Sequence, residues 1–211
     1  MKQISSPYRL YLVTDPTGLS ADGFLQVIDQ ACQAGVSLVQ LREKTATSRD
    51  LFQKAQAVKA ITDRYQIPLI IDDRLDICQA VGAAGLHVGD EDLPVEVARK
   101  ILGPDAIIGV SSKSLDAAQA AVAGGASYLG VGAIFPTKTK VKTQATSIET
   151  LKEITRTVPV PVVAIGGIKS HNLAQLTASG VAGVAMVSEI MQAPDVAGKV
   201  AELNQLLTQV L

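Results

Sequence analysis

Short aliphatic runs alternate with amphipathic helical patterns along the whole chain. The first run covers residues 9–15, and in the pattern after it Phe24, Ile28 and Ala31 fall on one helical face because they are three to four residues apart. Gly35 follows and is expected to end that helix. Eight strand-like runs can be counted in this way, over residues 9–15, 37–43, 68–73, 85–89, 107–112, 128–135, 160–167 and 183–188.

Polar residues before the helical patterns predict where helices begin. Thr47 is followed three residues later by Asp50, and Thr146 by Glu149, which is the spacing of a capping box. We also expect a helix that starts at Ser170, and a last helix over residues 194–210.

The strand-like runs are continuous rather than alternating with polar residues, as is typical of parallel strands covered on both faces. Eight strand–helix pairs favour an α/β fold, a single (β/α)8 TIM barrel in which residues 1–211 form one catalytic domain. A doubly wound open sheet fits the same alternation. It would usually carry a glycine-rich turn after its first strand, where this chain has Asp15, Pro16 and Thr17. The closed barrel is therefore predicted.

Composition and charge exclude several classes of protein. The 19 Lys and Arg residues nearly balance the 20 Asp and Glu residues, so no overall field attracts nucleic acid or an anionic membrane. No apolar stretch is long enough to span a bilayer, and the first residues lack the apolar segment of a secretory signal. We therefore expect a cytoplasmic protein. Cys32 and Cys78 lie in helical patterns and are interpreted as buried hydrophobic side chains.

In such a barrel, polar residues at the carboxyl ends of the strands face the active site. Gln40, Arg42 and Lys44 occupy alternate positions at the end of the second strand, so they point to the same side and supply an amide and two cations. This combination suits an anionic substrate. The alternative is that Arg42, Glu43 and Lys44 form an ordinary solvated loop.

Carboxylates gather after the third and fourth strands, where Asp72 and Asp73 precede one helix and Asp90 and Asp92 precede the next. Mg²⁺ commonly binds through one or two carboxylates and completes its shell with water and phosphate oxygens. The sequence therefore predicts a magnesium site. The alternative is that these residues cap the helices that follow them.

The last three strands end in groups that can bind phosphate. Hydroxyl and ammonium groups follow the sixth strand, and backbone amides are available after the seventh and eighth. Ser111, at the end of the fifth strand, has no neighbouring base in the sequence and is interpreted as a hydrogen-bond donor rather than a nucleophile. His87 and His171 have no such partner in the sequence either, and we expect structural roles for both.

Taken together, these segments resemble the thiamine-phosphate synthase family, from Tyr11 to near the end of the chain. Order and spacing of the motifs both agree with the family. The motifs are QLREK (40–44), DDR (72–74), LHVGDEDLP (86–94), GVSS (109–112), PTKTK (136–140), AIGGI (164–168) and MVS (186–188).

The resemblance implies a transferase that couples an aminopyrimidine, carried as its hydroxymethyl diphosphate, to a thiazole phosphate, with Mg²⁺ as cofactor. The pyrimidine diphosphate would be held by Gln40, Leu41, Arg42, Glu43, Lys44, Asp72, Ser111 and Lys140. The thiazole phosphate would contact Thr137, Lys138, Thr139, Gly167, Val187 and Ser188. The metal ligands would be Asp73 and Asp92, and the catalytic residues Arg42, Lys44, Ser111 and Lys140.

Diphosphate would leave first, because the electron-rich pyrimidine delocalises the resulting cation while the metal and the basic side chains stabilise the leaving group. Two positions depart from the family pattern: Asp72 stands where it usually has Asn, and Asp90 where it usually has Gln. Each replaces an amide with a negative charge near the expected diphosphate.

Two other readings remain open. One is a related thiazole tautomerase, whose pattern has a histidine where this chain has Lys113. The other is a noncatalytic phosphate-binding barrel. The partners expected are small-molecule substrates, with no nucleic acid and no membrane, and the oligomeric state is open, a homodimer included.

Overall fold

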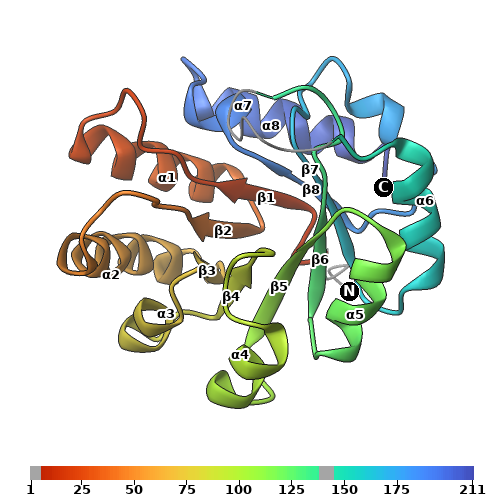
Figure 1. Ribbon diagram of the computed structural model, residues 1–211. Coiled ribbons are helices and arrows are strands. Elements are labelled where there is room, and N and C mark those ends of the chain that lie inside the picture. Colours follow the sequence, from red (N-terminus) through yellow and green to blue (C-terminus); the bar gives the residue numbers. More distant parts are fainter. Residues whose placement is uncertain (1–5, 138–144) are drawn as a thin grey trace, which may run out of the picture.

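A computed structural model describes residues 6–137 and 145–211. Eight parallel strands form a closed barrel in chain order, and β1 pairs with β8, so the predicted TIM barrel is confirmed and the open sheet is wrong (Figure 1). The assignment of all 211 residues to one domain stays a prediction. The strands are β1 Leu10–Val13, β2 Leu38–Leu41, β3 Leu69–Asp72, β4 Gly85–Val88, β5 Ile107–Ser112, β6 Tyr128–Val131, β7 Val162–Ile165 and β8 Gly183–Met186.

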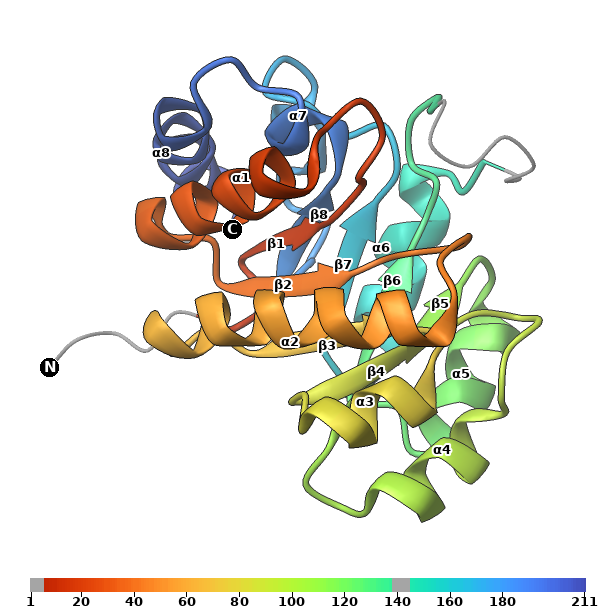
Figure 2. The ribbon, with the colours of Figure 1, turned by 90° about the vertical axis from the view of Figure 1, so that its left-hand side faces the viewer.

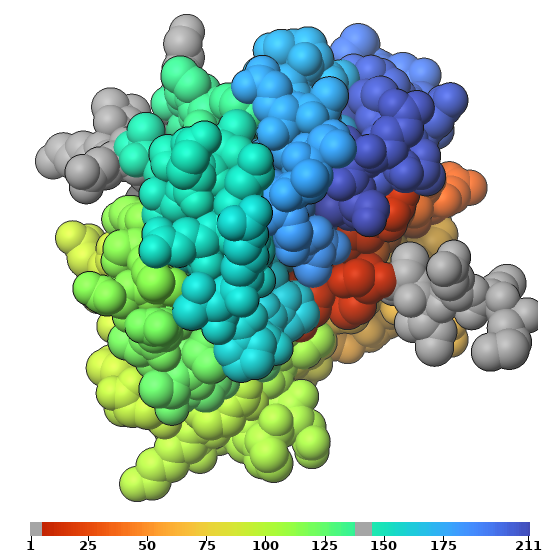
Figure 3. Space-filling view, turned by 90° about the vertical axis from the view of Figure 1, so that its right-hand side faces the viewer, coloured from red at the N-terminus to blue at the C-terminus, as the bar shows by residue number. Residues whose placement is uncertain are grey.

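Helices surround the barrel on its outside. Figure 2 shows α2 lying across the outside of β2 and β3, and Figure 3 shows α6, η1 and α8 side by side on another face. Among the described residues, no helix is long and apolar enough to cross a membrane. The helices are α1 Ala21–Ala34, α2 Ser48–Arg64, α3 Leu75–Val81, α4 Val95–Leu102, α5 Leu115–Ala123, α6 Ile148–Thr157, the 3₁₀ helix η1 Leu173–Leu176, α7 Ser188–Met191 and α8 Val196–Leu207.

Strand residues are divided between two hydrophobic clusters. Along β1, Leu10 and Leu12 pack outward in the cluster shared with the helices, whereas Tyr11 and Val13 pack in a smaller cluster inside the barrel. Successive side chains of a strand point to opposite faces, and here both faces are buried. This explains why the strand-like runs of the sequence are continuous rather than alternating.

The two ends of the described chain meet where the barrel closes. Leu10 of β1 is in register with Val184 of β8. The Arg9 guanidinium donates to the backbone oxygen of Asn204 on α8 at 3.2 Å, and the Asn204 amide donates to the backbone oxygen of Gly35 at 3.1 Å. The last helix is therefore tied to the beginning of the fold.

Of the four helix starts predicted, two are found and two differ; the last helix, expected over residues 194–210, is α8 with Asp195 as its N-cap. Thr47 accepts a hydrogen bond from the Asp50 amide as expected. The second capping box is wrong by one residue: Thr146 is buried, its amide donates to the Ala133 oxygen, and Ser147 caps α6 instead. The helix expected from Ser170 is also wrong, and only the short η1 forms there.

The reason for the second difference is a contact made across the barrel rim. The Ser170 amide and hydroxyl both donate to Oε1 of Glu189, at 3.1 and 2.9 Å, which holds the segment in a loop before Leu173. Two further expectations are confirmed: Gly35 ends α1 in the left-handed conformation with φ 103°, and Cys32 and Cys78 are buried free cysteines.

Candidate active site

The loops that follow the strands come together at one end of the barrel, because all eight strands are parallel. Figure 2 shows the loops after β2 and β4 projecting from the same side. At the end of β2, Lys44 Nζ lies 2.8 Å from Asp72 Oδ2 and also contacts Asp73, and Arg42 Nε lies 3.9 Å from Asp72 Oδ2. The two cations are therefore ion-paired, which disfavours an ordinary solvated loop.

Two members of the same predicted segment point away from this rim. Leu41 is buried in the outer cluster with the helices. The Glu43 carboxylate pairs with Lys54 on α2 and accepts hydrogen bonds from Thr45, which hold its pKa below the usual range although burial opposes this. A substrate contact at Leu41 or Glu43 would therefore have to come from the main chain.

Asp73 and Asp92 face each other across the ends of β3 and β4. The Asp73 amide donates to the His87 oxygen at 2.8 Å, and its backbone is left-handed with φ 60°. Asp92 Oδ2 accepts from the Gly89 amide at 2.7 Å. Burial raises the pKa of Asp92, and the Asp73 carboxylate raises it further against the effect of the Gly89 hydrogen bond. The two predicted metal ligands are thus brought together.

The helix-capping alternative is wrong for these carboxylates. Arg74 occupies the N-cap position of α3, and Pro94 occupies that of α4. Neither helix start has a hydrogen bond from a capping side chain. Asp90 instead pairs with Lys113 at 2.9 Å. The charge at Asp90 is therefore balanced by a lysine from the neighbouring loop.

Asp72 is the most buried carboxylate of the group. Burial raises its pKa, and the charge of Asp73 adds to that effect, although Lys44 and Arg42 oppose it. Both departures from the family pattern, at positions 72 and 90, therefore have a basic partner in the structure.

Ser111 meets a residue whose role the sequence did not reveal. His87 Nε2 lies 3.0 Å from Ser111 Oγ, and its Nδ1 lies 2.9 Å from the hydroxyl of Tyr128. Ser111 has no neighbouring base along the sequence, but the barrel brings the imidazole of His87 to its hydroxyl. The available signal was that His87 is the one polar side chain in an aliphatic strand, flanked by Leu86 and Val88, which face the helices.

The loops after β6, β7 and β8 meet on the other side of the rim. A Cβ atom on Gly167 would lie 2.5 Å from the Pro136 oxygen, so only glycine allows these two loops to approach so closely. Glu189 accepts hydrogen bonds from Ser170 and pairs with Lys169 at 3.3 Å, which ties the β7 and β8 loops together. Thr137 is the last described residue before the gap in the loop after β6, and Lys138, Thr139 and Lys140 lie outside the described residues.

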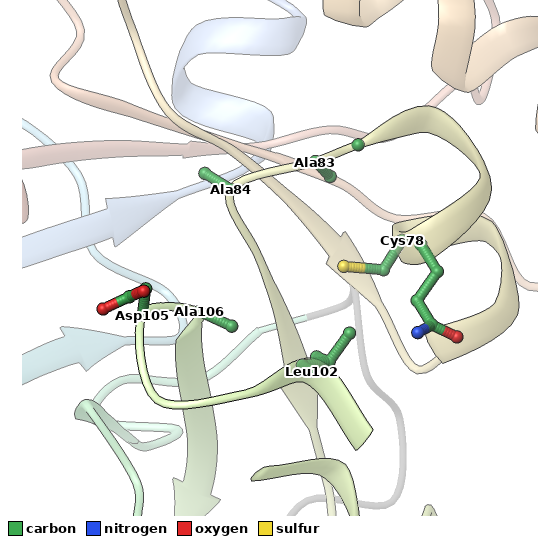
Figure 4. Close-up of a pocket in the computed structure, with 8 residues that line it drawn as sticks. Cys78, Ala83, Ala84, Leu102, Asp105 and Ala106 are labelled. Carbon is green, nitrogen blue, oxygen red and sulfur yellow. The ribbon is translucent and has the colours of Figure 1, made fainter. Parts of the chain in front are cut away.

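A shallow hollow of about 400 Å³ lies elsewhere on the molecule (Figure 4). Its lining includes Cys78, Ala84, Leu102 and Ala106. Ala84 and Ala106 directly precede β4 and β5, so the hollow is at the amino ends of these strands, away from the rim that carries the cations and carboxylates. Catalytic groups of such barrels lie at the opposite end, and this hollow is not the active site.

Fold and rim together define the class: a (β/α)8-barrel enzyme whose strand ends offer cations, paired carboxylates and closely approaching backbone to phosphorylated substrates. The family model described as thiamine monophosphate synthase matches residues 10–190. The chain therefore belongs to the thiamine-phosphate synthase family.

Similar proteins agree with this assignment over nearly the full chain. A thiamine-phosphate synthase of Lacticaseibacillus paracasei is 59% identical over 96% of this chain and 95% of its own. Thiamine-phosphate synthase 2 of Streptococcus pneumoniae is 54% identical over 96% and 97%. The solved structure of a thiamine phosphate pyrophosphorylase from Pyrococcus furiosus superposes with a TM-score of 0.90 at 35% identity and covers 98% of both chains.

Proposed function

We propose that this protein is a thiamine-phosphate synthase, which joins the pyrimidine diphosphate to the thiazole phosphate and releases diphosphate. The observation that carries the proposal is the placement of Lys44 and Arg42 against the carboxylates at the ends of β3 and β4. The names of its relatives support the same activity.

Mg²⁺ is the cofactor we propose, with Asp73 and Asp92 as its ligands. The fit rests on two neighbouring carboxylates, since the Asp73 carboxylate raises the pKa of Asp92, an effect that a bound divalent cation would relieve. Among the described residues there is no cluster of three or more acidic, histidine or cysteine ligands. Two carboxylates suffice for Mg²⁺, since water and phosphate oxygens complete its shell. When bound, the metal would neutralise charge on the diphosphate.

The side chains at the β2 end would bind and activate the pyrimidine substrate. Gln40 lies inside the barrel, where an amide can bind the aminopyrimidine, and Arg42 and Lys44 would hold the diphosphate together with Lys140. The bond between the methylene carbon and the diphosphate oxygen breaks, and its electron pair leaves with the oxygen. The cations stabilise that developing charge.

The second substrate would be bound at the other side of the rim. Residues 137–139, Gly167, Val187 and Ser188 would contact the thiazole phosphate, and the contacts of Glu189 hold the β7 and β8 loops together there. The thiazole nitrogen lone pair then forms the new bond to the methylene carbon. Neither step requires a nucleophile from the protein, so binding in the correct orientation is the main task of the site.

The partners would be these small molecules, with no nucleic acid and no membrane among them. A biosynthetic enzyme of this kind would work in the cytoplasm. A homodimer stays an open alternative to the monomer.

The test is an assay of purified protein with pyrimidine diphosphate, thiazole phosphate and Mg²⁺, from which each component is omitted in turn. We expect thiamine phosphate and diphosphate in equal amounts only in the complete mixture. Conversion of a thiazole tautomer without joining of the two substrates would show that the protein is a thiazole tautomerase instead. Binding of the pyrimidine diphosphate and the thiazole phosphate without any turnover would show that the protein is a noncatalytic phosphate-binding barrel.

A further inference from the structure

Two predicted substrate residues on separate strands of the barrel, β2 and β5, are joined by a continuous hydrogen-bonded chain through its interior. Gln40 Nε2 donates to the Tyr11 hydroxyl at 2.8 Å, and the hydroxyls of Tyr11 and Tyr128 are 2.8 Å apart. Tyr128 then meets His87 Nδ1 at 2.9 Å, and His87 Nε2 meets Ser111 Oγ at 3.0 Å. We call these five residues the inner chain; it crosses β2, β1, β6, β4 and β5.

The barrel interior is shaped to hold the inner chain. A Cβ atom on Gly109 would lie 2.1 Å from Tyr128 Cζ and 2.5 Å from His87 Nδ1, so this position on β5 must lack a side chain. Tyr128 is fully buried and Tyr11 is 2% exposed, whereas His87 and Ser111 are half-buried. Water therefore has no access to the link between the two phenols and cannot replace it when it is lost.

The links of the inner chain fix one another's direction because a phenol has a single hydrogen. Tyr11 accepts from Gln40, so its own hydrogen points to Tyr128, and the hydrogen of Tyr128 points to His87 Nδ1. Burial raises the pKa of both phenols, so both keep their hydrogens at neutral pH. An imidazole whose Nδ1 accepts a hydrogen bond carries its hydrogen on Nε2, and Nε2 of His87 then donates to Ser111.

We infer that the inner chain sets the donor and acceptor character of both its ends, with Tyr128 as the positioning residue that couples them. Gln40 presents its carbonyl oxygen to the amino group of the pyrimidine, and Ser111 presents its hydroxyl hydrogen to an oxygen of the diphosphate. The naming of these ligand groups rests on the proposed function; the direction of the inner chain does not.

This direction also distinguishes Ser111 from the serine of a hydrolase. A catalytic histidine must accept the serine proton on Nε2, and a carboxylate usually holds its Nδ1 hydrogen. Here Nδ1 faces a phenol that donates, so Nε2 is the donor and Ser111 the acceptor. The pair at 3.0 Å therefore orients a hydroxyl and does not generate a nucleophile.

The first test measures the tautomer of His87 in the free protein, by nitrogen chemical shifts of histidine-labelled samples. The chain has two histidines, and a His171→Gln variant assigns the signals. We expect the Nε2–H tautomer in the wild type and a mixture of tautomers in Tyr128→Phe. An Nδ1–H tautomer in the wild type would overturn the inferred direction. Because no substrate is present, this result is independent of the proposed function.

The second test measures synthase kinetics. Tyr128→Phe keeps the ring but removes the central hydroxyl, and we expect KM for the pyrimidine diphosphate to rise about tenfold. Ser111→Ala should then raise this KM by a smaller factor in the Tyr128→Phe background than in the wild type. Tyr8→Phe is the matched control, since the Tyr8 ring is 4.9 Å from that of Tyr128 but its hydroxyl is outside the inner chain; we expect less than about a twofold change. An equal rise in KM on Ser111→Ala in both backgrounds would overturn the inference that Tyr128 couples the two ends.

Discussion

Lys44 Nζ lies 2.8 Å from Oδ2 of Asp72, so a cation from the β2 loop is held against the buried carboxylate that ends β3. At this position the family resemblance leads one to expect asparagine. The ion pair explains how a charged residue is accommodated, but it also occupies a lysine that we propose for binding diphosphate.

Asp72→Asn should therefore strengthen binding of the pyrimidine diphosphate. The substitution removes one negative charge and frees Lys44, which at the rim amounts to about 1 kcal/mol, or about a fivefold lower dissociation constant. Calorimetric titration with the diphosphate substrate measures the change. Asp63→Asn alters the net charge equally at an exposed ion pair on α2 and should have no effect. Weaker binding by Asp72→Asn would contradict the assignment.

Asp92→Asn should lower kcat/KM by about a hundredfold or more at a fixed Mg²⁺ concentration, because it removes one of two proposed metal ligands. The loss should be partly recovered at high Mg²⁺. Asp90→Asn is the matched control, since Asp90 is exposed and paired with Lys113, and it should retain activity within about threefold. Steady-state kinetics across a Mg²⁺ series measures both variants, and equal losses would argue against a special role for Asp92.

Gly167→Ala should destabilise the protein and weaken binding of the thiazole phosphate. The new methyl would lie 2.5 Å from the Pro136 oxygen at a left-handed position with φ 67°. Gly82→Ala has a similar φ of 62° and open space around it, so it should cost only the backbone strain of about 1–2 kcal/mol. Thermal unfolding and KM for the thiazole phosphate separate the two. A Gly82→Ala variant as damaged as Gly167→Ala would show that crowding at the rim is unimportant.

Glu189→Gln should destabilise the fold in a pH-dependent way. Burial opposes the charge, but hydrogen bonds from Ser170 and the pairing with Lys169 hold the pKa of Glu189 below its usual value of 4.5. An acid with a lowered folded pKa stabilises the fold above its unfolded pKa, and this contribution disappears as the pH falls through the folded pKa. The difference from wild type should be about 1 kcal/mol at pH 7.

That difference should shrink when the pH is lowered past about 4.5, the value for the unfolded chain. Denaturant unfolding at a series of pH values measures it. Glu153→Gln, at an exposed position on α6, provides the control and should change stability little at any pH. A constant difference across the series would mean that charge on Glu189 is not what ties the loops.

Much of the fold is predictable from the sequence, because burial on both faces leaves each strand a continuous aliphatic run. The strands are shorter than these runs by up to four residues, since the ends of several runs belong to loops; the run over residues 128–135 contains only Tyr128–Val131 as strand, and its apolar end lies in the rim loop. Helix starts are less predictable. The loops before α6 and η1 are held by Ala133 and Glu189, which are distant in sequence from the helices they delay.

The candidate site is predictable in its residue types but not in its internal contacts. Alternation along β2 correctly separates Arg42 and Lys44 from Glu43, which pairs with Lys54. No pattern along the chain reveals that His87 meets Ser111 through the barrel, because that contact depends on the register of neighbouring strands. The roles assigned to Lys138, Thr139 and Lys140 stay predictions.

The closure of the barrel between β1 and β8 has a consequence for the protein during its synthesis. The first strand leaves the ribosome early, yet its edge is paired only when the chain around Val184 has emerged, and α8 locks Arg9 later still. Until then the nascent chain carries an open aliphatic edge that can pair with other chains. A chain truncated before β8 would therefore be an aggregation-prone fragment and not a smaller functional barrel.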